Sequence, residues 1–136
     1  MATYRGKRKT PQRDAVRDAI AAAGRPLSAE EILAKARKEV PALGLATVYR
    51  HLRYLLDRKQ VVTVEISGST PRFEPAQLAH HHHFHCRECD RVYEIAECPF
   101  HGQPHAPPGF RVENHEVTLT GICERCARQV PGSRSS

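Results

Sequence analysis

Two Cys-x-x-Cys pairs constrain the fold of this chain more than any other feature of its sequence. They are Cys86 with Cys89 and Cys123 with Cys126, and 33 residues separate the first pair from the second. Four thiolates are a common donor set of tetrahedral structural zinc, and a domain with a thin core needs such a staple. The pairs therefore predict a zinc site that joins two distant parts of the C-terminal half. Two redox dithiols or incidental cysteines are the alternative interpretation.

Basic residues and histidines are unevenly distributed along the 136 residues. Six basic residues crowd the stretch 5–17, whereas eight of the nine histidines lie between His80 and His115. The net charge of +6 favours an anionic partner, and the length allows one domain or two small ones. We therefore expect a basic binding domain over residues 1–75, a hinge at 76–78 and a metal-binding domain over residues 79–136.

The composition also excludes some classes of protein. No run of about 18 apolar residues is present that would span a membrane. The basic N-terminal stretch MATYRGKRKTPQR has no apolar core behind it, so we expect no signal peptide. A cytoplasmic location is therefore expected, in which the five cysteines stay reduced as thiols or metal ligands.

The first half of the chain predicts three helices. Thr10-Pro11 supplies an N-cap and a proline at the first helical position, and Gly24 ends the apolar period that follows. Ser28 and Glu31 form a capping box at the start of the second helix. A third amphipathic segment runs over residues 45–59, with leucine and valine on one face.

A β-hairpin is expected after the third helix. Val62, Val64 and Ile66 alternate as in a half-buried strand, residues 67–69 form the turn, and residues 72–74 begin the return strand. Three helices followed by a hairpin is the element order of a winged helix.

The second half predicts short strands. They are Phe84–Cys86, Val92–Ile95, Phe110–Glu113 and Glu116–Gly121. Four prolines between Cys98 and Gly109 disfavour a long helix there, so a loop or a single helical turn is expected.

A run of histidines precedes the first Cys-x-x-Cys pair. If this segment is extended, its side chains alternate, and His81, His83 and His85 share one face. His80 and His82 then occupy the other face, so one strand could supply ligands to two separate metal sites. The residues that could complete these sites are Glu74, Glu94, His101, His105 and His115. A solvated polyhistidine patch is the alternative interpretation.

The polar face of the third predicted helix is a candidate DNA contact. It carries Thr47, Tyr49, Arg50, His51 and Arg53. A helix with an apolar back and such a front suits the major groove, where arginine contacts guanine and phosphates. A solvated helix with scattered charges is the alternative. The stretch Arg5–Arg13 is either a basic arm for phosphates or the minor groove, or a solubilising tail.

Taken together, these motifs resemble those of the ferric uptake regulator family of bacterial metal-dependent repressors. The matching segments are Arg8–Arg13, Leu45–Leu52, Arg72–Glu74, His80–His83, Cys86 with Cys89, Gly109-Phe110, His115 and Gly121–Cys126. The resemblance covers about residues 8–126 in the family order. It implies an α+β protein with an N-terminal winged-helix DNA-binding domain and a small C-terminal α/β dimerisation domain, which contains an antiparallel sheet and structural zinc. It also implies a homodimer that binds palindromic double-stranded operator DNA.

The resemblance further implies the positions of the sites. Structural zinc maps to Cys86, Cys89, Cys123 and Cys126. The sensing site between the domains maps to Glu74, His81, His83 and Glu94. A site within the dimerisation domain maps to His80, His82, His101 and His115, with Glu97, Cys98 and His105 as rivals to His101. For the DNA contacts we select Arg13, Thr47, Tyr49 and Arg50 from the basic stretch and the polar face of the third predicted helix.

One family residue is missing from the sensing site. The family usually places a histidine before the second helix, where this chain has Pro26. The remaining glutamates and histidines form an oxygen and nitrogen donor set, which suits Fe(II) or Mn(II). A zinc-responsive regulator is an alternative, although no cysteine stands beside Glu74. A peroxide-responsive regulator is another, although it would use the histidine that Pro26 replaces.

We interpret the chain as a metal-dependent repressor of metal homeostasis genes, with zinc as structural cofactor and Fe(II) or Mn(II) as regulatory cofactor. Zinc is also compatible with the regulatory site. We expect no enzymatic activity, no small-molecule substrate and no membrane partner. A metalloenzyme is disfavoured because the sequence contains no HExxH pattern. A zinc-ribbon RNA-binding protein is the other alternative.

Overall fold

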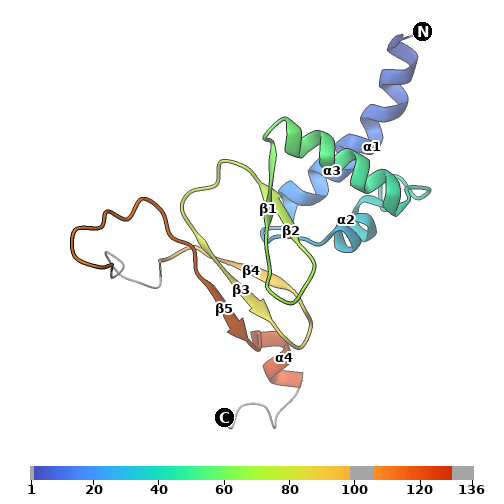
Figure 1. Cartoon of the computed structure of the whole chain (residues 1–136). Coiled ribbons are helices and arrows are strands. Elements are labelled where there is room, and N and C mark those ends of the chain that lie inside the picture. The colour runs from blue at the N-terminus through green and yellow to red at the C-terminus, as the bar shows by residue number, and fades with distance from the viewer. Residues whose placement is uncertain (1, 99–105, 130–136) are drawn as a thin grey trace. The chain divides into compact units, whose positions relative to one another are not determined.

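The computed structural model describes residues 2–98 and 106–129, and it divides into two compact units, one ending at Gln77 and one beginning at Leu78 (Figure 1). The first unit contains α1 (Ala2–Ala22), α2 (Ala29–Ala36), α3 (Leu45–Asp57), β1 (Val61–Val64) and β2 (Arg72–Pro75). The second unit contains β3 (His82–Cys86), β4 (Val92–Ile95), β5 (Thr118–Gly121) and α4 (Glu124–Gln129). The α+β class is as expected. In the described ranges, no helix has the length and apolar character that a membrane span requires.

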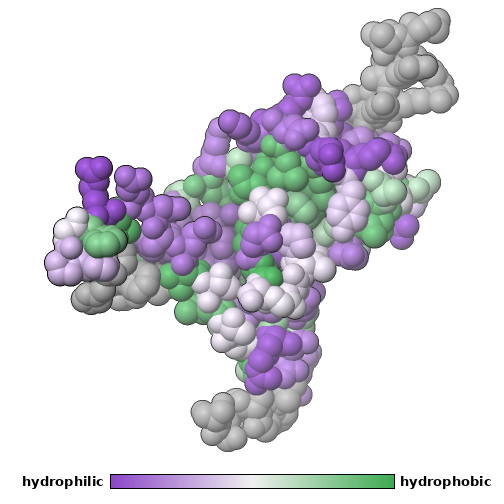
Figure 2. All heavy atoms as spheres, viewed as in Figure 1, coloured by the Kyte–Doolittle hydropathy of each residue, from purple (hydrophilic) through white to green (hydrophobic). Residues whose placement is uncertain are grey.

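One apolar core holds the helices and the hairpin of the first unit together. Its fully buried side chains include Val16, Ile20, Ile32, Val48, Leu52 and Leu55. Between α1 and α2, Leu27 exchanges two backbone hydrogen bonds with Phe73 of β2, at 3.0 and 2.8 Å. This bridge ties the α1–α2 connection to the hairpin. Figure 2 shows hydrophilic side chains (purple) around the apolar residues (green) over the helices.

Helix α1 begins earlier than its capping signal predicts. The signal places the start at Pro11, but the helix runs from Ala2 and contains Pro11. The proline removes one helical hydrogen bond, whereas the arginines and lysines before it have good helix propensity. The predicted end is confirmed, because Gly24 has φ +70°, a left-handed conformation that glycine adopts without strain.

The capping box predicted at the start of α2 is confirmed. Ser28 Oγ accepts the Glu31 N–H at 3.1 Å, and the Glu31 carboxylate accepts the Ser28 N–H at 3.0 Å. Arg25 adds an ion pair with Glu31 at 2.6 Å. Two backbone N–H groups at the start of the helix are thereby satisfied, and the helix buries Ile32 and Ala36.

Helix α3 ends in a Schellman motif that directs the chain into the hairpin. Lys59 adopts φ +60°, and the Gln60 N–H donates to the Leu55 carbonyl at 3.0 Å. This turn brings the next residue, Val61, onto the core.

The predicted hairpin is confirmed, with one error in its inward face. Strands β1 and β2 pair antiparallel, with Val62 opposite Glu74. Val61 and Val64 are buried, whereas Val62 is 40% exposed. The expectation that Val62 faces inward is wrong, because the buried positions of this short strand are its two ends, Val61 and Val64.

The sheet of the second unit has β3 at its centre. The strand order is β4-β3-β5, with β3 antiparallel to β4 and parallel to β5. The sheet is therefore mixed, whereas the sequence predicts an antiparallel one. Because β4 returns the chain to the edge of the sheet at which β3 begins, β5 can start at that edge and run parallel to β3.

The strand predicted over 110–113 is wrong. This segment has no regular structure, and Phe110 is 72% exposed. Instead, the Phe110 N–H donates to the Pro107 carbonyl at 3.1 Å, and Gly109 has φ +85°. A strand needs a partner for its backbone groups, and none of the described strands pairs with this segment. The loop predicted between Cys98 and Gly109 lies partly outside the described residues.

Candidate metal sites and DNA-contact helix

The two Cys-x-x-Cys pairs meet beside the end of β3. Cys86 is the last residue of β3, and a turn in which Asp90 has φ +63° carries the chain past Cys89 into β4. Cys123 directly precedes α4, and Cys126 lies in the first turn of that helix. The four Sγ atoms lie within 4.8 Å of one another, so the structure brings all four residues predicted for structural zinc into one four-cysteine cluster.

The sulfur positions fit a tetrahedral ion. Cys89 Sγ and Cys123 Sγ are 3.9 Å apart. Tetrahedral zinc, with Zn–S bonds of about 2.3 Å, holds its sulfurs about 3.8 Å apart. All five cysteines lie in the described ranges, and none is in a disulfide.

Hydrogen bonds favour the thiolate form of two cysteines in this cluster, Cys123 and Cys86. Tyr93 donates to the sulfur of Cys123 and lowers the pKa of that thiol to about 6. Burial raises the pKa of Cys86, but backbone N–H groups at 3.3 and 3.5 Å outweigh it and lower the pKa. Burial, with the adjacent thiols, raises the pKa of Cys126 to about 12. A divalent cation would remove this resistance to complete ionisation.

The histidines at residues 80–83, which lead into β3, alternate between two faces, as predicted. The rings of His81 and His83 are 4.9 Å apart. Glu94 lies directly opposite His83 in the β3–β4 pairing, so their side chains start from adjacent positions. Glu74 lies on β2 in the first unit, and its place in the sensing site stays a prediction. His85 instead contacts the cysteine turn, with its Nε2 2.6 Å from Asp90 Oδ1.

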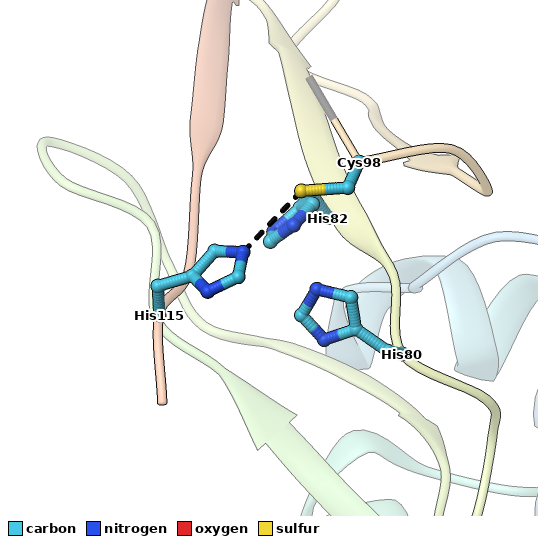
Figure 3. Close-up of side chains that lie close together, drawn as sticks. All are labelled: His80, His82, Cys98 and His115. Carbon is cyan, nitrogen blue, oxygen red and sulfur yellow. Dashed lines mark hydrogen bonds between the residues drawn. The ribbon is translucent and has the colours of Figure 1, made fainter. Parts of the chain in front are cut away.

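Four side chains converge on the other face of β3 (Figure 3). They are His80, His82, Cys98 and His115, whose donor atoms lie within 4.8 Å of one another. The ring of His80 is 4.5 Å from that of His82 and 4.9 Å from that of His115. Three residues predicted for the dimerisation-domain site are therefore adjacent. The fourth, His101, and its rival His105 lie outside the described residues, while Cys98 belongs to the cluster and Glu97 does not.

His82 is the most buried member of this His/Cys cluster, at 1% exposure. Its Nδ1 accepts the Val117 N–H at 3.1 Å, whereas its Nε2 is buried and has no hydrogen-bond partner. Burial and the neighbouring histidines lower its pKa, so the ring is neutral near pH 7. A neutral imidazole is the form that binds metal.

The polar face of α3 is exposed largely as predicted. Tyr49 is 49% exposed, and Arg50 is exposed with its guanidinium donating to Thr47 Oγ1 at 2.9 Å. Arg13 is half-buried and stacks on the Tyr54 ring, 4.1 Å from its centroid.

The expectation for His51 is wrong, because this residue is buried. Its Nε2 lies 3.4 Å from Gln12 Oε1 on α1. Helical periodicity explains the error: His51 is three residues after Val48 and four before Leu55, so it falls on their buried stripe.

Residues 4–120 match the Ferric uptake regulator family. The chain belongs to this family. It is 36% identical over 124 residues to the ferric uptake regulation protein of Bacillus subtilis (strain 168), covering 86% of this chain and 83% of that protein. Ferric uptake regulators are transcription regulators, and this chain is accordingly a DNA-binding, metal-binding regulator.

Solved structures agree with the family assignment. The Helicobacter pylori ferric uptake regulator, described as having three functional metal binding sites, is 25% identical with a TM-score of 0.63, covering 85% of this chain and 79% of that one. A zinc-bound manganese uptake regulator is 20% identical with a TM-score of 0.69, covering 82% of this chain and 87% of that one, and supports the fold.

Sequence reasoning missed Tyr93 as a partner of the four-cysteine cluster. Tyr93 faces Phe84 across the β3–β4 pair, and its hydroxyl reaches Cys123 from a strand remote in sequence. Only the β3–β4 register, which is a tertiary property, reveals this contact.

Proposed function

We propose that this member of the ferric uptake regulator family is a homodimeric, metal-dependent repressor of metal homeostasis genes that binds palindromic operator DNA in the cytoplasm. In this proposal the first unit is a winged-helix DNA-binding domain and the second is the dimerisation domain. The protein acts by binding, without catalysis. The domain boundaries, 1–75 and 79–136 with a hinge at 76–78, belong to the same proposal.

The observation that carries the proposal is the exposed face of α3. Tyr49 and Arg50 stand free of the core, while Val48, Leu52 and Leu55 fix the opposite face in place. A helix held rigidly by its back can present its front to the major groove, with arginine on a guanine edge or a phosphate. We assign Thr47, Tyr49 and Arg50 to operator contact, together with Arg13 from α1.

The four-cysteine cluster would hold the structural zinc. Its sulfur spacing fits the tetrahedral ion, and zinc would fasten α4 to the turn after β3. Because such a site forms only when the chain folds, its binding free energy stabilises the second unit.

Regulation would act through Glu74, His81, His83 and Glu94. These carboxylates and imidazoles suit Fe(II) or Mn(II). A metal bound by residues of both domains would favour one spacing of the two recognition helices in the dimer, which is a shift between existing conformations. By linkage, operator DNA would tighten metal binding by the same factor.

The decisive experiment is a titration of operator affinity with Fe(II), Mn(II), Zn(II) and Ni(II) separately, at buffered free metal and stated salt. We expect Fe(II) or Mn(II) to tighten binding to a palindromic site that footprinting protects. Equal affinity with and without metal would contradict the proposal, as would a footprint without two-fold symmetry.

A zinc-responsive regulator is the second candidate, since zinc binds imidazole and carboxylate more tightly than Fe(II) or Mn(II) does. It would be favoured if only zinc, at free concentrations far below those of iron, stimulated operator binding. A peroxide-responsive regulator lacks support in the connection between α1 and α2, where Pro26 is buried and offers no ligand atom.

A further inference from the structure

The His/Cys cluster on the second face of β3 brings four possible metal ligands together. All four residues belong to the second unit, and their donor atoms span no more than 4.8 Å (Figure 3). Cys98 Sγ is 3.3 Å from His115 Nε2. A tetrahedral zinc ion with one sulfur and three nitrogen ligands would hold such a pair about 3.6 Å apart. Shifts of the order of an ångström would therefore close the cluster around an ion.

An unpartnered buried atom points independently to a ligand. His82 Nε2 is buried without a hydrogen-bond partner, in a side chain that is almost fully enclosed. A buried polar atom left in this way costs free energy. The histidines, packed ring against ring, have no carboxylate in the cluster to offset a positive charge. A bound cation would give His82 Nε2 a partner, and the Cys98 thiolate would supply the negative charge that the cluster otherwise lacks.

The family resemblance already places a metal site at His80, His82 and His115, and we propose that its fourth ligand in this chain is the Cys98 thiolate, and not His101, which makes it a second zinc site. The site itself stands on the geometry of the second unit alone. Its consequence for regulation rests on the proposed function: β3 would sort two metals, with zinc on the Cys98 face and Fe(II) or Mn(II) on the His83 face.

The donor set explains the sorting. A thiolate is a softer ligand than a carboxylate and favours zinc over Mn(II) and Fe(II). On binding, Cys98 loses its proton to solvent, so the site has one negative ligand and three neutral ones. Coordination through Nε2 of His82 requires the ring to carry its proton on Nδ1, and the Val117 hydrogen bond is then given up.

The experiment uses the full-length dimer with zinc in its four-cysteine cluster, titrated with Co(II) as a spectroscopic probe while bound zinc is measured. We expect a sulfur-to-cobalt charge-transfer band to appear with one equivalent of Co(II), and Zn(II) but not Mn(II) to abolish it. Cys98→Ser should lose the band and bind Co(II) at least about 100-fold more weakly, since even outer-shell changes cost 10- to 100-fold. The matched control, His101→Ala, should behave as the parent.

Alkylation provides a readout that needs no substitution. Zinc should protect Cys98 of the parent protein from iodoacetamide, as followed by mass spectrometry, because a coordinated thiolate reacts more slowly than a free one. The proposal is overturned if Cys98 is alkylated equally with and without zinc, if Cys98→Ser retains the band, or if His101→Ala loses it. Operator binding is measured in parallel: its absence would defeat the proposed function and leave the cobalt result to decide the site.

Discussion

Tyr93 favours the ionised form of one cysteine in the four-cysteine cluster. Its hydroxyl donates to Cys123 and holds the pKa of that thiol at about 6, while the pKa of Tyr93 itself rises to about 12. Protons compete with zinc for thiolates, so a higher thiol pKa means that zinc is lost at a higher pH. The tyrosine therefore acts on the metal through a ligand that it stabilises.

We predict that Tyr93→Phe raises the pH at which half of the zinc is released and weakens zinc binding about 10- to 100-fold at neutral pH. The sign follows because loss of the donor raises the pKa of Cys123. The measurement is zinc release to a chromogenic chelator across a pH series, with Tyr49→Phe on exposed α3 as the matched control. Superimposable release curves for Tyr93→Phe and the parent would show that the hydroxyl has no such role.

At the scale of an element, α2 depends on the Glu31 carboxylate, which accepts hydrogen bonds from Arg25 and from the Ser28 N–H. Burial raises its pKa, but the hydrogen bond from Arg25 and the Ser28 N–H outweigh burial, and the net pKa is lowered from 4.5. A group with a depressed folded pKa contributes stability above its unfolded pKa and loses it as pH falls through the folded value.

We therefore predict that Glu31→Gln lowers the free energy of unfolding by about 1 kcal/mol at pH 7, because glutamine can still accept the Ser28 N–H but loses the ion pair with Arg25. The difference from the parent should persist down to about pH 4.5 and shrink below it, as the parent's own carboxyl is protonated. Urea unfolding at several pH values measures this. Glu30→Gln, on the exposed side of the same turn, is the control and should change stability little.

The elements that could be predicted from sequence are those with local causes. The capping box of Ser28 with Glu31 and the stop at Gly24 depend on neighbouring residues, and the structure confirms both. The parallel β3–β5 pairing depends on the route of a long connection and has no local signal. The 110–113 segment alternates like a strand, and its pattern therefore predicts one. It is not a strand because none of the described strands pairs with it.

The candidate sites divide in the same way. The four-cysteine cluster and the alternation of His80 to His83 follow from residue type and spacing. The structure brings the four cysteines together, pairs His81 with His83, and pairs His80 with His82. Cys98 could not be chosen over its rivals, because a proline-rich connection does not fix which donor returns to β3. His51 was misplaced because its polarity outweighed its helical position in the prediction.

Helix α3 carries a prediction about recognition. Tyr49→Ala and Arg50→Ala should both weaken operator binding while metal content and dimerisation stay unchanged, since both side chains are exposed. If Arg50 contacts a base, its loss should cost about 1–3 kcal/mol of discrimination between operator and random DNA. If it contacts a phosphate, affinity should fall on all sequences, and the salt slope should decrease by about one unit.

Fluorescence anisotropy at several salt concentrations, with operator and scrambled duplexes, separates these outcomes. Arg58→Ala is a suitable control, because its guanidinium stacks on Tyr54, 4.4 Å from the ring centroid, at the far end of the helix. Parental affinity and specificity in both α3 variants would mean that another surface contacts DNA.

At the scale of the whole molecule, the two faces of β3 place the adjacent histidines His82 and His83 in different proposed metal sites. His83 lies on the face with His81, opposite Glu94, and belongs to the proposed sensing site that includes Glu74 of the first unit. His82 lies on the other face with His115, in a cluster contained within the second unit. Metal on the first face can bias the orientation of two domains, whereas metal on the second can only stabilise one.

We therefore predict that His83→Ala abolishes metal-stimulated operator binding but leaves a stable, zinc-containing dimer. His82→Ala should instead lower the melting temperature, because it removes a buried ring and a proposed zinc ligand, and should retain at least part of the metal response. Operator titrations with Fe(II) and Mn(II), thermal melts and zinc analysis on both variants provide the three readouts. If His82→Ala loses the metal response while His83→Ala keeps it, sensing belongs to the Cys98 face, and the two roles are reversed.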